Sequence, residues 1–181
     1  IVVKPRWPCG APLLQAQNQD PQWRQIQRQR HRLPMVRLVE GVEKPGNLGA
    51  MLRTADAAGV DAVVAADPVT DWGNPNVVRA SKGTVYAVPV ASASTAETLA
   101  WCRARGIRLV VTTPETDVLY SDISLSGAVA VAVGAEKHGA SEELLAAADV
   151  RVRIPMSGRA NSLNVAASAA IVLFEAVRQR R

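Results

Sequence analysis

From Met35 to the end of the chain, short apolar runs rich in Val and Ala alternate with stretches whose apolar residues have helical spacing. Gly59, Gly106 and Ser141 stand where such helical stretches would end or begin. Strand and helix patterns that alternate this regularly predict a parallel sheet with helices on its faces. We therefore expect an α/β fold built on a mostly parallel sheet.

The expected elements follow directly from these patterns. Strands are expected at 35–42, 60–67, 84–90, 107–114, 128–136 and 150–156. Helices are expected at 45–59, 77–83, 95–105, 141–149 and 162–178. The last helix is apolar all round between Val165 and Phe174, which predicts burial on most sides or, alternatively, a subunit interface.

Residues 1–34 differ in character from the rest, because they are rich in Pro, Gln and Arg and carry six basic residues against one acid. We interpret them as a basic, polar N-terminal extension or the remnant of an upstream substrate-binding domain, followed by one domain at 35–181. The net charge of +5 arises in this segment. It would attract a polyanion such as nucleic acid, although a basic tail is also a common solubilising feature.

The composition points away from metal and membrane proteins. Cys9 and Cys102 are far apart and lie in no metal-ligand spacing, which indicates a reduced, cytoplasmic chain without a structural metal. No apolar run reaches the roughly 18 residues that a membrane span needs, and no signal-peptide pattern opens the chain.

Four segments carry candidate functional residues. In 43–56, Asn47 and Arg53 lie near a helix start, where they could bind an anion. Alternatively, Asn47 belongs to an ordinary turn and cap, and Arg53 lies on a solvated helix face. In 76–83, Arg79 and Lys82 share one side of a short helix and could contact phosphates or only solvent. In 133–141, glycines follow a buried strand, where the backbone either turns or approaches a ligand closely; Glu136 there could be a plain surface charge.

The fourth segment, 154–165, joins a strand to the apolar last helix and places Ser162 and Asn164 at the start of that helix. Ser162 as an N-cap would explain one polar residue. This cap leaves Asn164 unexplained, because an Asn inside the first turn of a helix slightly disfavours that helix. Polar side chains beyond a strand end of an open α/β sheet are well placed to bind a ligand.

In this order the segments resemble the SpoU (TrmH-like) branch of the SPOUT RNA 2'-O-ribose methyltransferases. NLGAMLRTADAAG, GAEKHGAS and IPMSGRANSLNVAASAA are similar to three signature motifs of that family, and VVRASKGTVYAVPV to a fourth block. The resemblance implies a C-terminal trefoil knot, S-adenosylmethionine as methyl donor, rRNA or tRNA as substrate, and a homodimer whose active sites use both subunits.

The resemblance also implies roles for single residues. Cofactor binding is implied for Gly134, Glu136, Ile154, Met156, Ser162 and Leu163. Catalytic positions are implied for Asn47, Arg53, Glu136, Ser162 and Asn164. Contacts with RNA are expected from Arg53, Arg79, Lys82, Arg28 and Arg30.

The chemistry limits what Arg53 can do. A guanidinium stays protonated under ordinary conditions, so we expect Arg53 to hold a phosphate of the target nucleotide rather than to act as the base. The alternative function is a non-catalytic RNA-binding protein that retains the fold, whose expected sign is the loss of Arg53 or Asn164; both are present. A dehydrogenase is disfavoured, because the G-x-G-x-x-G fingerprint is absent.

Overall fold

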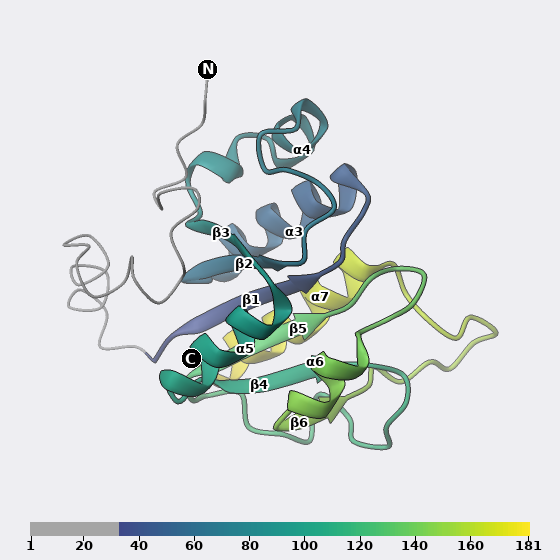
Figure 1. Ribbon diagram of the computed structural model, residues 1–181. Coiled ribbons are helices and arrows are strands. Elements are labelled where there is room, and N and C mark those ends of the chain that lie inside the picture. The colour runs from purple at the N-terminus through teal and green to yellow at the C-terminus, as the bar shows by residue number, and fades with distance from the viewer. Residues whose placement is uncertain (1–32) are drawn as a thin grey trace.

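The computed structural model describes residues 33–181, and Figure 1 shows how their elements are arranged. The expected extension at 1–34, with Arg28 and Arg30, lies almost wholly outside the described residues. No helix within 33–181 has both the length and the apolar character that crossing a bilayer requires.

Six parallel strands form the sheet, in the order β3-β2-β1-β5-β4-β6. They are β1 Met35–Glu40, β2 Ala62–Ala66, β3 Val90–Ala93, β4 Arg108–Thr112, β5 Val129–Val133 and β6 Val150–Val152. The predicted parallel α/β architecture is therefore confirmed. Strands β1 and β5 lie side by side in the centre, so the segments that follow them emerge at the same edge of the sheet.

Helices cover both faces of the sheet (Figure 1). They are α3 Pro45–Ala58, α4 Pro75–Ser81, α5 Thr95–Ala104, α6 Glu142–Ala147 and α7 Val165–Gln179. Strand β1 supplies residues alternately to both layers: Met35 and Val39 pack with α3 and α7, whereas Val36 and Leu38 pack with α5 and α6. Successive side chains of a strand point to opposite faces, which gives this division.

Helix α4 packs closely on α3 because Gly49 has no side chain. A Cβ at Gly49 would lie 2.5 Å from the Cβ of Ala80 and 2.8 Å from the backbone nitrogen of Ser81. Only glycine leaves room for this approach. The two helices are therefore packed directly against each other.

The expected strand at 84–90 is wrong over most of its length. Thr84–Tyr86 form a 3-10 turn, η1, and β3 begins only at Val90. Gly83 adopts a left-handed conformation with φ +88°, and its carbonyl accepts a hydrogen bond from the backbone nitrogen of Tyr86 at 3.0 Å. This local turn prevails over the strand propensity of Val85 and Tyr86.

The last helix also departs from expectation. It begins at Val165, three residues later than expected, and Asn164 rather than Ser162 is its N-cap. Within one chain it is not buried on most sides: Ala169, Val172, Leu173 and Ala176 are buried, but Phe174 is 47% exposed. One apolar side of α7 thus remains in contact with solvent.

The C-terminal end of α7 holds the segment that precedes β5. The Gln179 side chain accepts from the backbone nitrogen of Leu125 at 2.7 Å and donates to the carbonyl of Ile123 at 3.0 Å. Arg180 Nε donates to the carbonyl of Leu125 at 3.0 Å. These bonds tie distant parts of the C-terminal half together, and the trefoil knot there stays a prediction.

Candidate functional site

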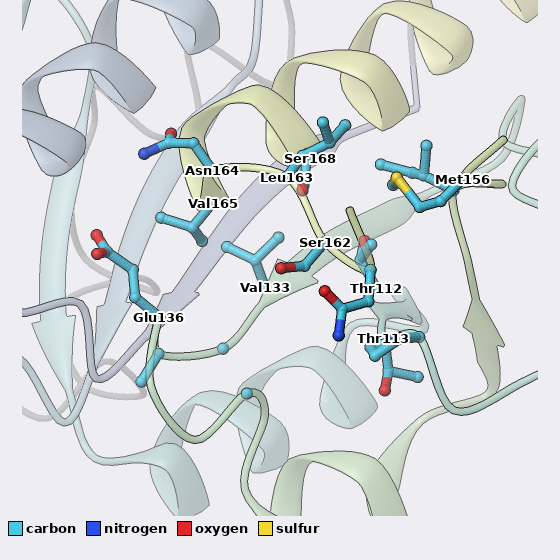
Figure 2. A pocket seen from close by; sticks show the side chains of 16 residues that line it. Thr112, Thr113, Val133, Glu136, Met156, Ser162, Leu163, Asn164, Val165 and Ser168 are labelled. Carbon is cyan, nitrogen blue, oxygen red and sulfur yellow. The ribbon is translucent and has the colours of Figure 1, made fainter. Parts of the chain in front are cut away.

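A cavity of about 470 Å³ opens where β4 and β5 end. Its walls come from residues 112–114 at the end of β4, residues 133–136 and 139 at the end of β5, the loop between β6 and α7, and the first turn of α7. Figure 2 shows Glu136 and Asn164 at one side of this cavity and Met156 and Thr113 at the other. Ligands of open α/β sheets bind at the carboxyl ends of strands, and the volume suits a small molecule of nucleotide size.

Gly134 lets the chain turn at the cavity wall. A Cβ at this position would stand 2.1 Å from both the backbone nitrogen of Ala140 and the carbonyl carbon of Gly139. Gly139 itself has φ +72°. The second segment of the sequence is therefore a loop folded tightly on itself, which brings Glu136 to the rim of the cavity.

Three polar side chains at the cavity mouth are joined by hydrogen bonds. The Asn47 Nδ2 amide donates to Glu136 Oε1, and the Asn164 Nδ2 amide donates to Asn47 Oδ1 at 3.2 Å. Asn47 stands in the first turn of α3, Glu136 after β5 and Asn164 before α7. The fold thus brings together residues from three of the segments singled out in the sequence.

Asn164 has two roles that use different atoms. Its Oδ1 accepts a hydrogen bond from the backbone nitrogen of Ala166 at 2.9 Å, which caps α7, while its Nδ2 reaches Asn47. A side-chain oxygen at an N-cap satisfies one of the free backbone N–H groups of a helix start. The cap also fixes the direction of the amide, because both groups belong to one planar side chain.

Glu136 has a second partner, Lys44, whose Nζ donates to Oε2 of the same carboxylate. The Glu136 side chain is 20% exposed, whereas that of Lys44 is 71% exposed. This hydrogen bond and the charge of Glu136 raise the pKa of Lys44 above its ordinary value. Lys44 therefore remains a cation at neutral pH.

All six residues expected to bind the cofactor line the cavity. They are Gly134, Glu136, Ile154, Met156, Ser162 and Leu163. Sequence reasoning missed the wall formed after β4 by Thr112, Thr113 and Pro114. Thr112 Oγ1 is buried there without a hydrogen-bond partner among the described residues. A strand end with two threonines was visible in the sequence, but only the sheet order places it beside β5.

Of the expected RNA-binding residues, the three that the structure describes do not line the cavity. Arg53 is exposed on α3, and Arg79 and Lys82 are exposed on and just after α4. The Arg79 guanidinium donates to Asn76 Oδ1 at 3.3 Å. Arg53 is therefore not part of the cavity lining that holds Ser162 and Asn164, although all three were expected at catalytic positions.

The described residues hold no group of three or more His, Cys, Asp or Glu side chains arranged to bind a metal ion. The polar groups at the cavity are instead amides, hydroxyls and one carboxylate. These bind organic ligands through hydrogen bonds.

Comparison with known proteins identifies the family. Residues 34–174 match the SpoU rRNA Methylase family. The chain belongs to this family. The match covers every motif that predicted it, so the expected SpoU relationship is confirmed.

Among SpoU relatives, the 23S rRNA (guanosine(2553)-2'-O)-methyltransferase RlmP of Bacillus subtilis is 37% identical over 139 residues, which are 77% of this chain and 56% of the relative. The 23S rRNA (guanosine-2'-O-)-methyltransferase RlmB of Shewanella oneidensis is 38% identical over 150 residues, which are 82% of this chain and 61% of the relative. The chain thus spans less than two thirds of the length of either protein.

A solved structure, that of an AdoMet-bound rRNA methyltransferase from Sinorhizobium meliloti, superposes with a TM-score of 0.77 at 40% identity. The superposition covers 80% of this chain and 56% of that one. The similarity therefore extends over most of the fold of this chain as well as over the motifs.

Proposed function

We propose that this SpoU chain transfers a methyl group from S-adenosylmethionine to a ribose 2'-hydroxyl of RNA. The observation that carries the proposal is the hydrogen-bonded set Glu136, Asn47 and Asn164 at the mouth of a cavity lined by all six expected cofactor residues. The names of the relatives support the reaction class, and those named above act on 23S rRNA.

The cavity fits the methyl donor in both size and chemistry. Ile154, Met156 and Leu163 offer apolar surface for a flat base, and Ser162 offers a hydroxyl in the same cavity. Thr112 Oγ1 has spare hydrogen-bonding capacity in the wall. When bound there, S-adenosylmethionine would supply an electrophilic methyl group.

The residues at the mouth would orient the acceptor ribose. Methyl transfer needs the 2'-oxygen in line with the methyl carbon and needs the hydroxyl proton to leave. Ser162 and Asn164 stand at the loop end that faces this position and would hold the ribose by hydrogen bonds. Asn47 and Glu136 would fix the Asn164 amide through their own bonds.

Arg53, Arg79 and Lys82 would bind the RNA backbone. All three are exposed, and α3 and α4 present them on neighbouring packed helices. Exposed cations bind phosphates with a marked dependence on salt, because counterions are released. We assign Arg53 to a phosphate next to the target nucleotide, where the phosphate could help accept the departing proton.

We further propose that the working unit is a homodimer. The apolar side of α7 that includes Phe174 is exposed in one chain, and Arg53 does not line the cavity of its own chain. A second copy packed on α7 would cover Phe174 and could bring its Arg53 toward this cavity. The F174D variant should change the mass measured by light scattering from dimer to monomer; an unchanged mass would contradict this interface.

The experiment that tests the function uses purified chain, S-adenosylmethionine and a 23S rRNA transcript. Nucleosides from digested RNA, separated by mass spectrometry, should contain one 2'-O-methylated species that is absent without the chain. RNA binding without transfer would instead support the non-catalytic alternative. Because the relatives named above are bacterial proteins that act on 23S rRNA, we assign the chain to the cytoplasm.

A further inference from the structure

Two loops at the carboxyl ends of the central strands carry the same dipeptide. Glu43-Lys44 follows β1, and Glu136-Lys137 follows β5, its parallel neighbour. Lys44 pairs with Glu136, and Lys137 Nζ lies 3.5 Å from Glu43 Oε2. Each lysine thus pairs with the glutamate of the other loop, and we call these two ion pairs the crossed pairs.

The two crossed pairs differ in their exposure and in the further hydrogen bonds that their carboxylates make. Lys137 and Glu43 are 72% and 50% exposed, and Glu43 has no further side-chain bond among the described residues. Exposed ion pairs of this kind contribute little to the stability of a fold. The Glu136 side chain is 20% exposed and uses both oxygens, Oε2 for Lys44 and Oε1 for Asn47. Only the pair made by Lys44 therefore connects to the hydrogen-bonded amides at the cavity mouth.

We propose that Lys44 is a positioning residue that holds the Glu136 carboxylate in the orientation in which it binds the Asn47 amide. The inference rests on the proposed function of this site. Once Glu136 holds Asn47 Nδ2, the Oδ1 atom of Asn47 points to Asn164 and accepts its amide. Lys44 thus acts on the reacting groups indirectly, through the three residues Glu136, Asn47 and Asn164.

Two properties of Lys44 fit this role. The raised pKa means that it keeps its charge across the working pH range, so it serves as a fixed cation rather than as a proton acceptor. It is also the N-cap residue of α3, but its side chain makes no capping hydrogen bond. Substitution of the side chain therefore leaves the start of the helix intact.

The structure offers a matched control. The K44Q and K137Q variants each remove one cation of nearly equal exposure from one of the crossed pairs. K44R keeps a cation that can bond to a carboxylate. If Lys44 instead contacted an RNA phosphate directly, its loss would raise KM for RNA and leave kcat unchanged.

The first measurement uses the protein without ligands, so that it does not depend on catalysis. In NMR spectra of the 15N-labelled chain, the side-chain amide signals of Asn47 can be assigned with the N47A variant. In K44Q, the chemical shifts of these signals should move toward those of an amide without a hydrogen-bond partner. They should stay in place in K137Q and largely so in K44R. Unchanged Asn47 signals in K44Q would overturn the proposal.

The second measurement is kinetic. With RNA and S-adenosylmethionine saturating, kcat should fall about tenfold or more in K44Q, since small misplacements of orienting groups cost that much. It should recover in K44R and stay within about twofold of wild type in K137Q. An effect confined to KM for RNA, or an equal loss in K137Q, would overturn the positioning role. An inactive wild type with the Asn47 shifts intact would instead refute the proposed function.

Discussion

The side-chain amide of Asn164 donates a hydrogen bond to the side-chain oxygen of Asn47, 3.2 Å away and 117 residues earlier in the chain. This bond joins the start of α7 to the start of α3 across the mouth of the cavity. Because Asn47 is held in turn by Glu136, the direction of the Asn164 amide depends on three segments of the fold. We regard this arrangement as the centre of the proposed active site.

The N164D variant separates the two roles of Asn164. An aspartate can still accept the bond from the backbone nitrogen of Ala166 and cap α7, but it cannot donate to Asn47. The free energy of unfolding should therefore change little, whereas kcat should fall by about 100-fold, as for the loss of one orienting donor. Urea unfolding and single-turnover kinetics measure the two effects.

The matched control for N164D is N74D. Asn74 caps α4 in the same way, with its Oδ1 accepting from the backbone nitrogen of Asn76 at 2.9 Å, but it lies outside the cavity lining. Activity should be retained in this variant. Equal loss of activity in N74D, or wild-type kcat in N164D, would contradict the role of the Asn164 amide.

The G134A variant should damage both the loop and the cavity. The added methyl group would stand 2.1 Å from the backbone of Gly139 and Ala140, so the loop has to move. Such overpacking typically costs about 1–3 kcal/mol. We expect a lower melting temperature together with weaker S-adenosylmethionine binding by calorimetry. In G127A, where no atom lies within 4 Å of the added Cβ, both values should match wild type; G134A binding as tightly as wild type would count against this cavity wall.

Arg37 is a fully buried cation with no acidic partner among residues 33–181, and its removal should stabilise the fold. Its guanidinium reaches only the Val131 carbonyl at 3.4 Å and the Met51 sulfur at 3.7 Å, and Nε has no partner among the described residues. In R37M the free energy of unfolding should rise by about 1 kcal/mol or more. In R103M, which removes an exposed charge, it should change by less than about 0.5 kcal/mol.

The pH dependence gives a second test of Arg37. Burial lowers its pKa to about 9, so the folded chain binds its proton less tightly than the unfolded chain does. The cost of the buried charge is complete below about pH 9 and decreases as the pH rises above it. The difference in unfolding free energy between R37M and wild type should therefore narrow above about pH 9. If this difference in unfolding free energy stays constant with pH, the stabilisation in R37M arises from the shape of the side chain and not from the loss of its charge.

The sequence predicted the sheet and its helices well, because buried strands and amphipathic helices leave strong patterns. The sequence patterns could not predict the positions at which local hydrogen bonds, rather than hydrophobic periodicity, decide the backbone conformation. Gly83 turns 84–86 into a 3-10 turn, and the cap made by Asn164 moves the start of α7 to Val165. The presence of Asn164, which a helix beginning at Ser162 left unexplained, is accounted for by this later start.

The part of the candidate site that lies in the sequence motifs was predictable, because the motifs occur in the order typical of the family. The six residues expected to bind the cofactor do line one cavity. The wall formed by Thr112 and Thr113 was missed, because strand order is a property of the folded sheet rather than of sequence periodicity. Lys44 was missed for a similar reason. Its pairing with Glu136 joins two loops 92 residues apart, and nothing in either loop alone indicates it.

The most direct test maps ribose methylation in the ribosomal RNA of cells that contain or lack this chain. A methylated 2'-oxygen protects the adjacent phosphodiester bond from alkali, so each modified position appears as a missing cleavage. We predict that one protected position becomes cleavable when the chain is absent, and that protection returns with the wild-type chain but not with N164D. An identical cleavage profile in cells with and without the chain would contradict the proposal that it methylates ribosomal RNA.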